Sequence, residues 1–301
     1  MSPGHIRHDL FIYDTDDTFA AQLLRYVVAG LDADEAVRVV VSPHKEAILR
    51  EALGRDADLV AFADPLAVYT RPEFALAQSD AACSANEAGE GTRIYGELPV
   101  FDTPRAWDTW ITYEAIVNRA FENRCVTFMC GYDARVVPEA VLLQARQTHR
   151  VVLDDAWQVS QDYEEPETLV RSLTTPFEPL PGLRALPLGD SRELHDRLAE
   201  ELTAASLPES RAGDLLVAAG EVLCNARRYG SGVRNVRIGR VGEHVVCEVT
   251  DGGSGFDDPL AGFLPPRPLA ENQAGLWIAR QLTARLEMRS EPDGLTLRLW
   301  A

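Results

Sequence analysis

The chain has 301 residues, of which 46% are hydrophobic and 25% are charged, and its formal net charge is −18 at pH 7. This length and composition are typical of a globular protein with two domains, each large enough to bury its own core. The negative charge argues against a nucleic-acid partner and favours a basic protein or a divalent cation. Because no apolar run approaches the roughly 18 residues of a membrane span and residues 1–8 do not resemble a secretory leader, we expect a cytoplasmic protein with no membrane segment.

The cysteines and the single lysine restrict the chemistry further. The five cysteines form no C-x-x-C pair and are odd in number, which predicts reduced thiols. Cys125 and Cys130 lie in an apolar run, so we interpret them as core residues rather than metal ligands. Lys45 is the only lysine and lies in Pro-His-Lys-Glu, so the chain has no P-loop. The protein-kinase signatures are also missing, and any ATP chemistry would need another architecture.

Strand-like and helix-like segments alternate through the first half of the chain. We expect strands at 8–13, 36–41, 59–62, 93–97, 125–129 and 151–153, and helices at 19–31, 42–53, 72–87, 104–122 and 136–149. This alternation predicts an α/β domain with a parallel sheet covered by helices on both faces.

Ligands of such folds bind at the carboxyl ends of the strands. Polar or aromatic side chains that we expect near this edge are the candidates for a sensor pocket: His44, Glu97, Trp110, Glu114, Tyr132 and Asp133. The alternative for each is an ordinary loop residue or a packed aromatic ring.

This half resembles the MEDS domain, a sensory module of methanogen and methylotroph regulators, over about residues 5–160. The resemblance rests on the His8–Tyr13 strand, Arg93-Ile-Tyr-Gly-Glu97, Trp110-x-x-Tyr113-Glu114-x-x-x-Asn118, Cys130-Gly-Tyr-Asp133, Pro138 and His149. It implies a RecA-type fold without a P-loop and the sensing of a small-molecule ligand. We therefore assign residues 1–163 to a MEDS-like sensory domain.

Five prolines fall between Pro166 and Pro187, which predicts a stiff, extended linker over 164–187. The second domain then covers 188–301. It begins with Asp190-Ser-Arg-Glu193, a capping-box pattern for a helix start. His195-Asp196 follows, as in the phospho-accepting helix of histidine kinases, but a surface histidine is the alternative.

The next helix, expected over 210–228, carries Glu221 and Asn225 four residues apart and therefore on one face. Strands at 233–238 and 245–249 lead to Asp251-Gly-Gly-Ser-Gly255. Residues 257–272 are rich in proline and have little periodicity, which indicates a lid between two parts of a site. A helix over 275–286 and a hairpin of strands at 286–290 and 295–300 complete the chain.

Each of these residues suits one part of a nucleotide–magnesium site. An amide oxygen of Asn225 is a hard, neutral ligand for Mg²⁺, and Glu221 can deprotonate or orient an attacking hydroxyl. Asp251 can accept a hydrogen bond from an exocyclic amine of a base. Glycines at the turn allow close approach of the backbone, and Gly275 before a helix leaves N–H groups for a phosphate.

The set resembles the GHKL ATPase superfamily over about residues 188–301, and within it the anti-sigma-factor serine kinases of the RsbW and SpoIIAB type. The resemblance implies a two-layer α/β sandwich that binds ATP and Mg²⁺. It also implies phosphorylation of a serine on an STAS-type anti-anti-sigma protein and sequestration of a sigma factor. The implied roles are a general base for Glu221, magnesium binding for Asn225, adenine binding for Asp251, and pocket shaping for Gly253, Gly255, Gly275 and Leu276. The two halves together resemble RsbA-type regulators.

Two positions depart from this pattern. Tyr229 precedes Gly230 where many relatives have His-Gly, and Ala274 stands where the phosphate-side box often has a glycine. Three functions therefore remain: an ATP-dependent anti-sigma kinase, a binding module of the same fold that transfers no phosphate, and a histidine kinase using His195. The oligomeric state is open, with a homodimer among the options.

Overall fold

The computed structural model describes residues 6–86, 91–173, 177–256, 258–263 and 274–301. The chain divides into two compact units, Met1–Leu173 and Thr174–Ala301, which are treated separately below. In the described part of the chain, no helix combines the length and the apolar character that a membrane crossing requires.

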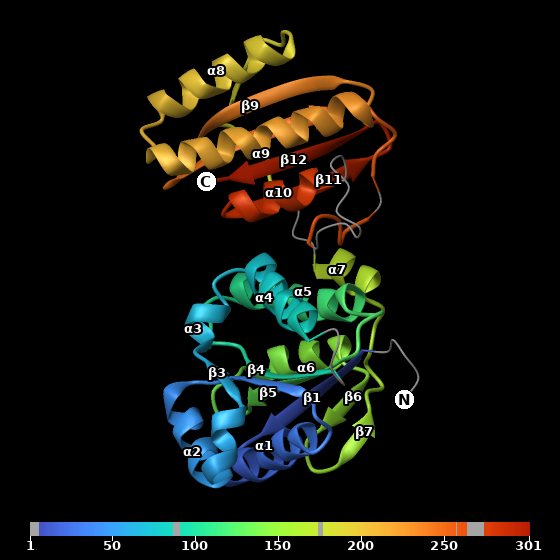
Figure 1. Ribbon diagram of the computed structural model, residues 1–301. Helices are drawn as coiled ribbons and strands as arrows, with labels where there is room; N and C mark the ends of the chain where they lie inside the picture. The colour runs from blue at the N-terminus through green and yellow to red at the C-terminus, as the bar shows by residue number, and fades with distance from the viewer. Residues whose placement is uncertain (1–5, 87–90, 174–176, 257, 264–273) are drawn as a thin grey trace. The chain divides into compact units, whose positions relative to one another are not determined.

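The first unit is built on a seven-stranded sheet in the order β3-β2-β4-β5-β1-β6-β7 (Figure 1). Neighbouring strands are parallel except for β6 and β7, which pair antiparallel. The strands are β1 (Arg7–Tyr13), β2 (Ala36–Val40), β3 (Ala61–Ala63), β4 (Thr92–Glu97), β5 (Val126–Asp133), β6 (Val151–Leu153) and β7 (Trp157–Val159).

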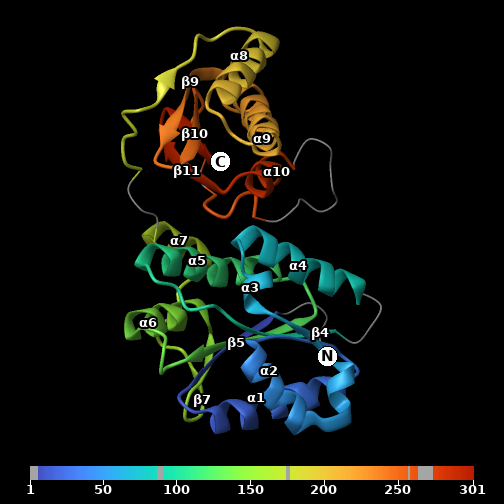
Figure 2. The ribbon, with the colours of Figure 1, turned by 90° about the vertical axis from the view of Figure 1, so that its left-hand side faces the viewer.

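Helices cover both faces of this sheet, as Figure 2 shows. One face packs on α1 (Asp16–Leu31) and α2 (Pro43–Leu53), and α5 (Pro104–Ala120) is the main helix on the other. The remaining helices are α3 (Pro65–Val68), α4 (Pro72–Ala85), α6 (Glu139–Thr148), α7 (Pro166–Leu173) and the 3₁₀ helix Gly54–Leu59. Because side chains alternate along a strand, Phe11 and Tyr13 of β1 face the α1 side, and His8 faces α5.

In its described residues, the second unit is a two-layer sandwich of an antiparallel sheet and three helices (Figure 2). The sheet order is β11-β12-β10-β9-β8. The elements are β8 (Arg184–Ala185), α8 (Ser191–Ala204), α9 (Glu209–Arg228), β9 (Val233–Val241), β10 (His244–Asp251), α10 (Gly275–Leu282), β11 (Arg285–Glu291) and β12 (Gly294–Trp300).

The apolar face of α9 is the centre of this unit. Leu215, Val222 and Leu223 are buried against the sheet, and the start of α9 follows Pro208, which fits just before a helix. The predicted capping box at Asp190 is present, since its carboxylate accepts hydrogen bonds from the N–H groups of Arg192 and Glu193.

Both halves have the predicted α/β character, but several local expectations differ from the structure. The segment predicted as an extended linker contains α7, because Pro166 fits a first helical turn and Leu169 and Val170 are buried on the side of α5. The same segment contains β8, which pairs with β9. The helix predicted to reach 286 ends at Leu282. Most of the predicted lid lies outside the described residues, apart from 258–263.

None of the five cysteines forms a disulfide, but the prediction that Cys125 is a core residue was wrong. Cys125 is exposed because β5 begins one residue later, at Val126, whereas Cys130 lies inside the strand and is buried.

Candidate functional site

A cavity of about 400 Å³ lies at the carboxyl ends of the parallel strands of the first unit. Glu97 at the end of β4, Asp133 at the end of β5 and Lys45 on α2 supply its charged groups. Much of the remaining lining is apolar, with Leu98 and Trp107 among the contributing residues. The position agrees with the rule that such sheets bind ligands at this edge.

Lys45 is the centre of the charged part of this cavity. Its ammonium lies 2.6 Å from Glu97 Oε2 and 3.5 Å from Asp133 Oδ2, and it also contacts the hydroxyl of Tyr13. The hydroxyls of Tyr13 and Tyr95 donate to Glu97 Oε1 at 2.9 and 2.6 Å. Burial raises the pKa of the Glu97 carboxyl, and the neighbouring ammonium opposes that rise.

Three of the six predicted sensor residues line this cavity: Glu97, Tyr132 and Asp133. His44 does not, because its side chain is 74% exposed and lies 3.5 Å from Asp16. Successive residues of a helix point about 100° apart, so Lys45, one position later, turns inward where His44 turns out. The signal that could have identified Lys45 is a lone cation on the helix that follows a strand end.

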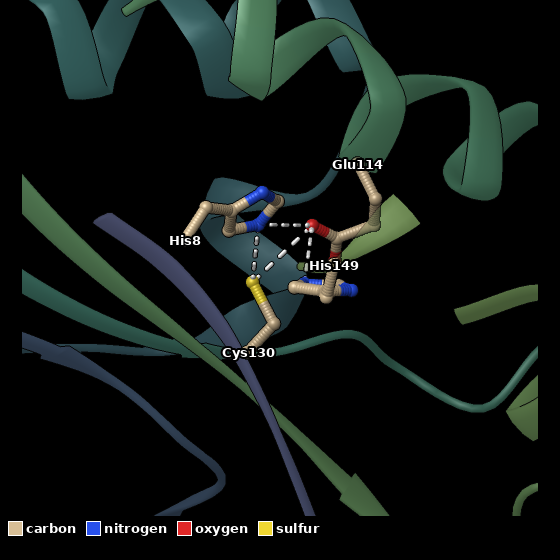
Figure 3. A group of neighbouring side chains, drawn as sticks. All are labelled: His8, Glu114, Cys130 and His149. Atoms are coloured by element: carbon tan, nitrogen blue, oxygen red, sulfur yellow. Dashed lines mark hydrogen bonds and ion pairs between the residues drawn. The ribbon is translucent and has the colours of Figure 1, made fainter. Parts of the chain in front are cut away.

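Trp110 and Glu114 lie on the opposite side of the sheet edge, on α5, and are not part of the cavity lining. Trp110 is buried and stacks on Phe101 at a centroid distance of 5.7 Å. Glu114 is 1% exposed and belongs to a separate buried group with His8, Cys130 and His149 (Figure 3).

In the second unit, Glu221 and Asn225 share one face of α9, as their spacing predicted, and this face meets the start of α10. A Cβ added at Gly275 would lie 2.9 Å from Glu221 Oε2 and 3.1 Å from Asn225 Nδ2. Only glycine therefore permits this approach without displacing a side chain. A carboxylate, an amide and the free N–H groups at a helix start are brought together here.

Asp251 ends β10 and is 7% exposed. Its Oδ1 accepts hydrogen bonds from the N–H groups of Gly253 at 3.0 Å and Leu295 at 2.9 Å. The other oxygen, Oδ2, faces Gly230, where an added Cβ would lie only 2.2 Å away. The carboxylate is thus fixed through one oxygen and leaves the other as an acceptor.

Gly253, Gly255 and Leu276 have roles in the local backbone and packing. Gly255 has a φ of +83°, and a Cβ there would lie 2.6 Å from the carbonyl oxygen of Glu291. Leu276 follows Gly275 in the first turn of α10 and packs partly against the core of the unit. Gly253 and Gly255 therefore shape the turn after Asp251.

Ala274 and Tyr229, the two departures from the family pattern, do not distort the backbone or fill the site. Ala274 has φ −86° and ψ −2°, a conformation open to any residue, and is buried. Tyr229 is 66% exposed at the end of α9, so its ring does not enter the space between Asp251 and Gly230.

His195 lies on the exposed face of α8, and its side chain is 56% exposed. The opposite face of α8 buries Leu194, Leu198 and Leu202 in the same core as α9. The helix that carries His195 is therefore an integral part of this unit.

Comparison with family models agrees with this division. Residues 7–150 match the MEDS family (MEthanogen/methylotroph, DcmR Sensory domain). Residues 185–300 match the histidine kinase-like ATPase domain family. A search of curated proteins finds no match.

Lys45→Met should destabilise the first unit by about 3–5 kcal/mol at neutral pH, because it leaves the buried Glu97 carboxylate without its main partner. A carboxyl whose pKa is raised by folding keeps its proton to a higher pH in the native state than in the unfolded state. Stability should therefore fall as the pH rises above 4.5, the ordinary pKa of glutamate, and more steeply in this variant than in the wild type. The free energy of unfolding of the first unit can be measured by hydrogen exchange of β4 and β5 peptides in urea over a pH series.

The double variant Lys45→Met/Glu97→Gln is the matched control, since it removes the titrating group and should abolish the added pH dependence. A Lys45→Met variant with wild-type stability at every pH would show that the ion pair contributes nothing.

Proposed function

We propose that this chain, which joins an N-terminal MEDS sensory domain to a C-terminal histidine kinase-like ATPase domain, is a signal-responsive anti-sigma factor and serine kinase. The pair of domains supports a regulatory ATPase or kinase, and ATP with Mg²⁺ is the cofactor of such domains in general. The observation that carries the kinase proposal is the meeting of Glu221 and Asn225 with the start of α10 at Gly275.

The residues present fit an ATP–magnesium complex. The absence of a side chain at Gly275 leaves backbone N–H groups of α10 beside the α9 face, where they can hold phosphate oxygens. Asn225 would supply an amide oxygen to Mg²⁺, and Asp251 Oδ2 would accept from the exocyclic amine of adenine. When bound, ATP–Mg²⁺ supplies the transferable phosphoryl group and neutralises its charge.

Glu221 is the candidate general base for the attacking hydroxyl. Its carboxylate is half-buried and points at the start of α10, where the phosphates would lie. In this role it accepts the proton of a protein serine as that oxygen attacks phosphorus. The substrate that we propose is a serine of an STAS-type anti-anti-sigma protein, by resemblance to the RsbW and SpoIIAB kinases.

Release of the phosphorylated antagonist would then leave the ATPase domain free to sequester a sigma factor. The net charge of −18 is consistent with a partner that presents basic groups. The second candidate is a non-catalytic binding module of the same fold. The same site would bind ATP and the same domain would bind the sigma factor, but Glu221 would not act as a base.

The cavity beside Lys45 is the proposed sensor site of the MEDS domain. Its volume of about 400 Å³ and partly apolar lining suit a small organic molecule. Lys45 and Asp133 of the lining pair with Glu97 and Arg135, and a polar ligand would exchange some of these contacts for its own. Binding there would supply the signal to which the kinase responds.

Glu221→Gln should lower phosphate transfer from radiolabelled ATP to the antagonist by about 10²–10⁴-fold, because the amide cannot accept the serine proton. ATP affinity should stay near the wild-type value. Glu209→Gln, an exposed position at the start of the same helix, is the matched control and should transfer normally.

Two results would redirect the proposal. Intact sigma-factor binding with no transfer by the wild-type chain would favour the binding module. An acid-labile label that disappears in His195→Ala would favour a histidine kinase.

Asp251→Asn should weaken ATP binding by roughly 10–100-fold, the value of a hydrogen bond to a charged acceptor. The two N–H groups that hold Oδ1 will keep the amide oxygen on their side, so the amide nitrogen takes the place of Oδ2 and opposes the adenine amine. Calorimetric titration with ATP measures the loss. Unchanged affinity would mean that the adenine is recognised elsewhere.

A further inference from the structure

Four side chains that can ligate a metal converge in the core of the MEDS domain (Figure 3). None of the four lines the Lys45 cavity, although Tyr132 of that lining donates to Glu114 Oε1 at 3.3 Å. His8 comes from β1, Cys130 from β5, Glu114 from α5 and His149 from the residue that ends α6. All four are buried, and one ligand atom from each lies within 4.8 Å of the others.

The closest distances centre on His8 Nε2, Cys130 Sγ and Glu114 Oε2, each of which is 3.2 Å from the other two. His149 Nε2 completes the group at 3.9 Å from Glu114 Oε2. A tetrahedral ion with ligands at about 2.0–2.3 Å needs donor atoms about 3.3–3.7 Å apart. The observed spacing requires only small side-chain shifts to reach that geometry.

Hydrogen bonds outside the group fix both imidazole rings. His149 Nδ1 lies 2.8 Å from the carbonyl oxygen of Ala145 and 2.8 Å from Thr148 Oγ1. The carbonyl can only accept and the Thr148 hydroxyl donates to that same carbonyl, so a proton on Nδ1 satisfies both contacts. His8 Nδ1 lies 3.1 Å from Asn118 Oδ1, and the Asn118 amide is oriented by donating to the Thr148 carbonyl at 2.7 Å. In their neutral forms, both rings therefore direct an Nε2 lone pair into the group, as metal-binding histidines do.

Without an ion, this arrangement leaves a buried acceptor unsatisfied. His149 Nε2 has no hydrogen-bond partner among the described residues, and the nearest charged group that it faces is the Glu114 carboxylate. A His8–Glu114 ion pair would satisfy its own members and still leave His149 without a partner.

We propose that His8, Glu114, Cys130 and His149 bind one divalent transition-metal ion, with Zn²⁺ the best match. Two imidazoles, one thiolate and one carboxylate form a mixed nitrogen, sulfur and oxygen set that suits Zn²⁺ and not the oxygen-seeking Mg²⁺ or Ca²⁺. On binding, Cys130 gives up its thiol proton to solvent and coordinates as the thiolate. With four protein ligands the site is closed, which is typical of a structural or sensing metal rather than a hydrolytic one.

A cavity borders this group at His8. It has a volume of about 620 Å³, and His8 and Asn118 form part of its wall. The carboxylates of this wall pair with its arginines: Glu122 and Glu167 contact Arg119, and Glu165 contacts Arg150.

Co²⁺ titration of the full chain, stripped with a chelator and kept reduced, tests the assignment without nucleotide or partner. We expect one Co²⁺ per chain, a thiolate-to-cobalt charge-transfer band and the intense visible bands of a tetrahedral site, all reversed by Zn²⁺. Cys130→Ser should remove the charge-transfer band, whereas Cys125→Ser, an exposed position just before the same strand, should retain it. Absence of the band in the wild type, or its persistence in Cys130→Ser, would overturn the proposal.

A second measurement does not depend on the folding of a variant. The thermal midpoint of the stripped wild-type MEDS domain, followed by hydrogen exchange within the full chain, should rise on adding Zn²⁺ and stay unchanged with Mg²⁺. A midpoint that moves with neither ion, or equally with both, would show that the four side chains form only a hydrogen-bonded core.

Discussion

The close approach of α10 to α9 at Gly275 is the contact on which the proposed nucleotide site depends. It exists because glycine leaves the space that a methyl group would take from Glu221 and Asn225. The apolar face of α9 holds the helix against the sheet, so the adjoining side that carries Glu221 and Asn225 has a fixed position relative to α10 and to Asp251. Gly230 has the same function beside Asp251, where a second missing side chain makes room for a carboxylate. The proposed site therefore depends on the missing side chains of Gly230 and Gly275 as well as on Glu221, Asn225 and Asp251.

In the MEDS domain the corresponding constraint is the pairing of buried charge. Lys45 pairs with Glu97, and with Arg135 it balances Asp133, beside one cavity. A different set of donors surrounds Glu114. Burial of a carboxylate is costly unless it has such partners, so both groups are fixed in position by the fold. The first group borders a cavity and can respond to a ligand. The second is buried, with His8 in the wall of another cavity, and has the composition of a metal site.

The sequence was sufficient for the architecture and for the α9 face, because both depend on local spacing. Alternating strands and helices predicted the α/β sheet, and the four-residue interval of Glu221 and Asn225 placed them on one helix face. Contacts between distant segments were not accessible in this way. The choice of His44 over Lys45 failed because helix phase cannot be known to one residue, and the grouping of His8 with His149 depends on strand order and on α6. The helix α7 was missed because five prolines obscured a buried pair of apolar residues, Leu169 and Val170.

The most direct measurement of the central claim is calorimetric ATP binding, with Mg²⁺, by Gly275→Ala and by Gly220→Ala. A methyl group at Gly275 must displace Glu221 or Asn225, and we expect ATP affinity to fall by about tenfold or more, ~1.4 kcal/mol. Gly220 lies on the same helix α9 as both side chains, but a Cβ there meets nothing within 4 Å, so its variant should bind as the wild type does. Equal ATP affinity for the Gly275→Ala variant and the wild type would contradict a nucleotide site between α9 and α10.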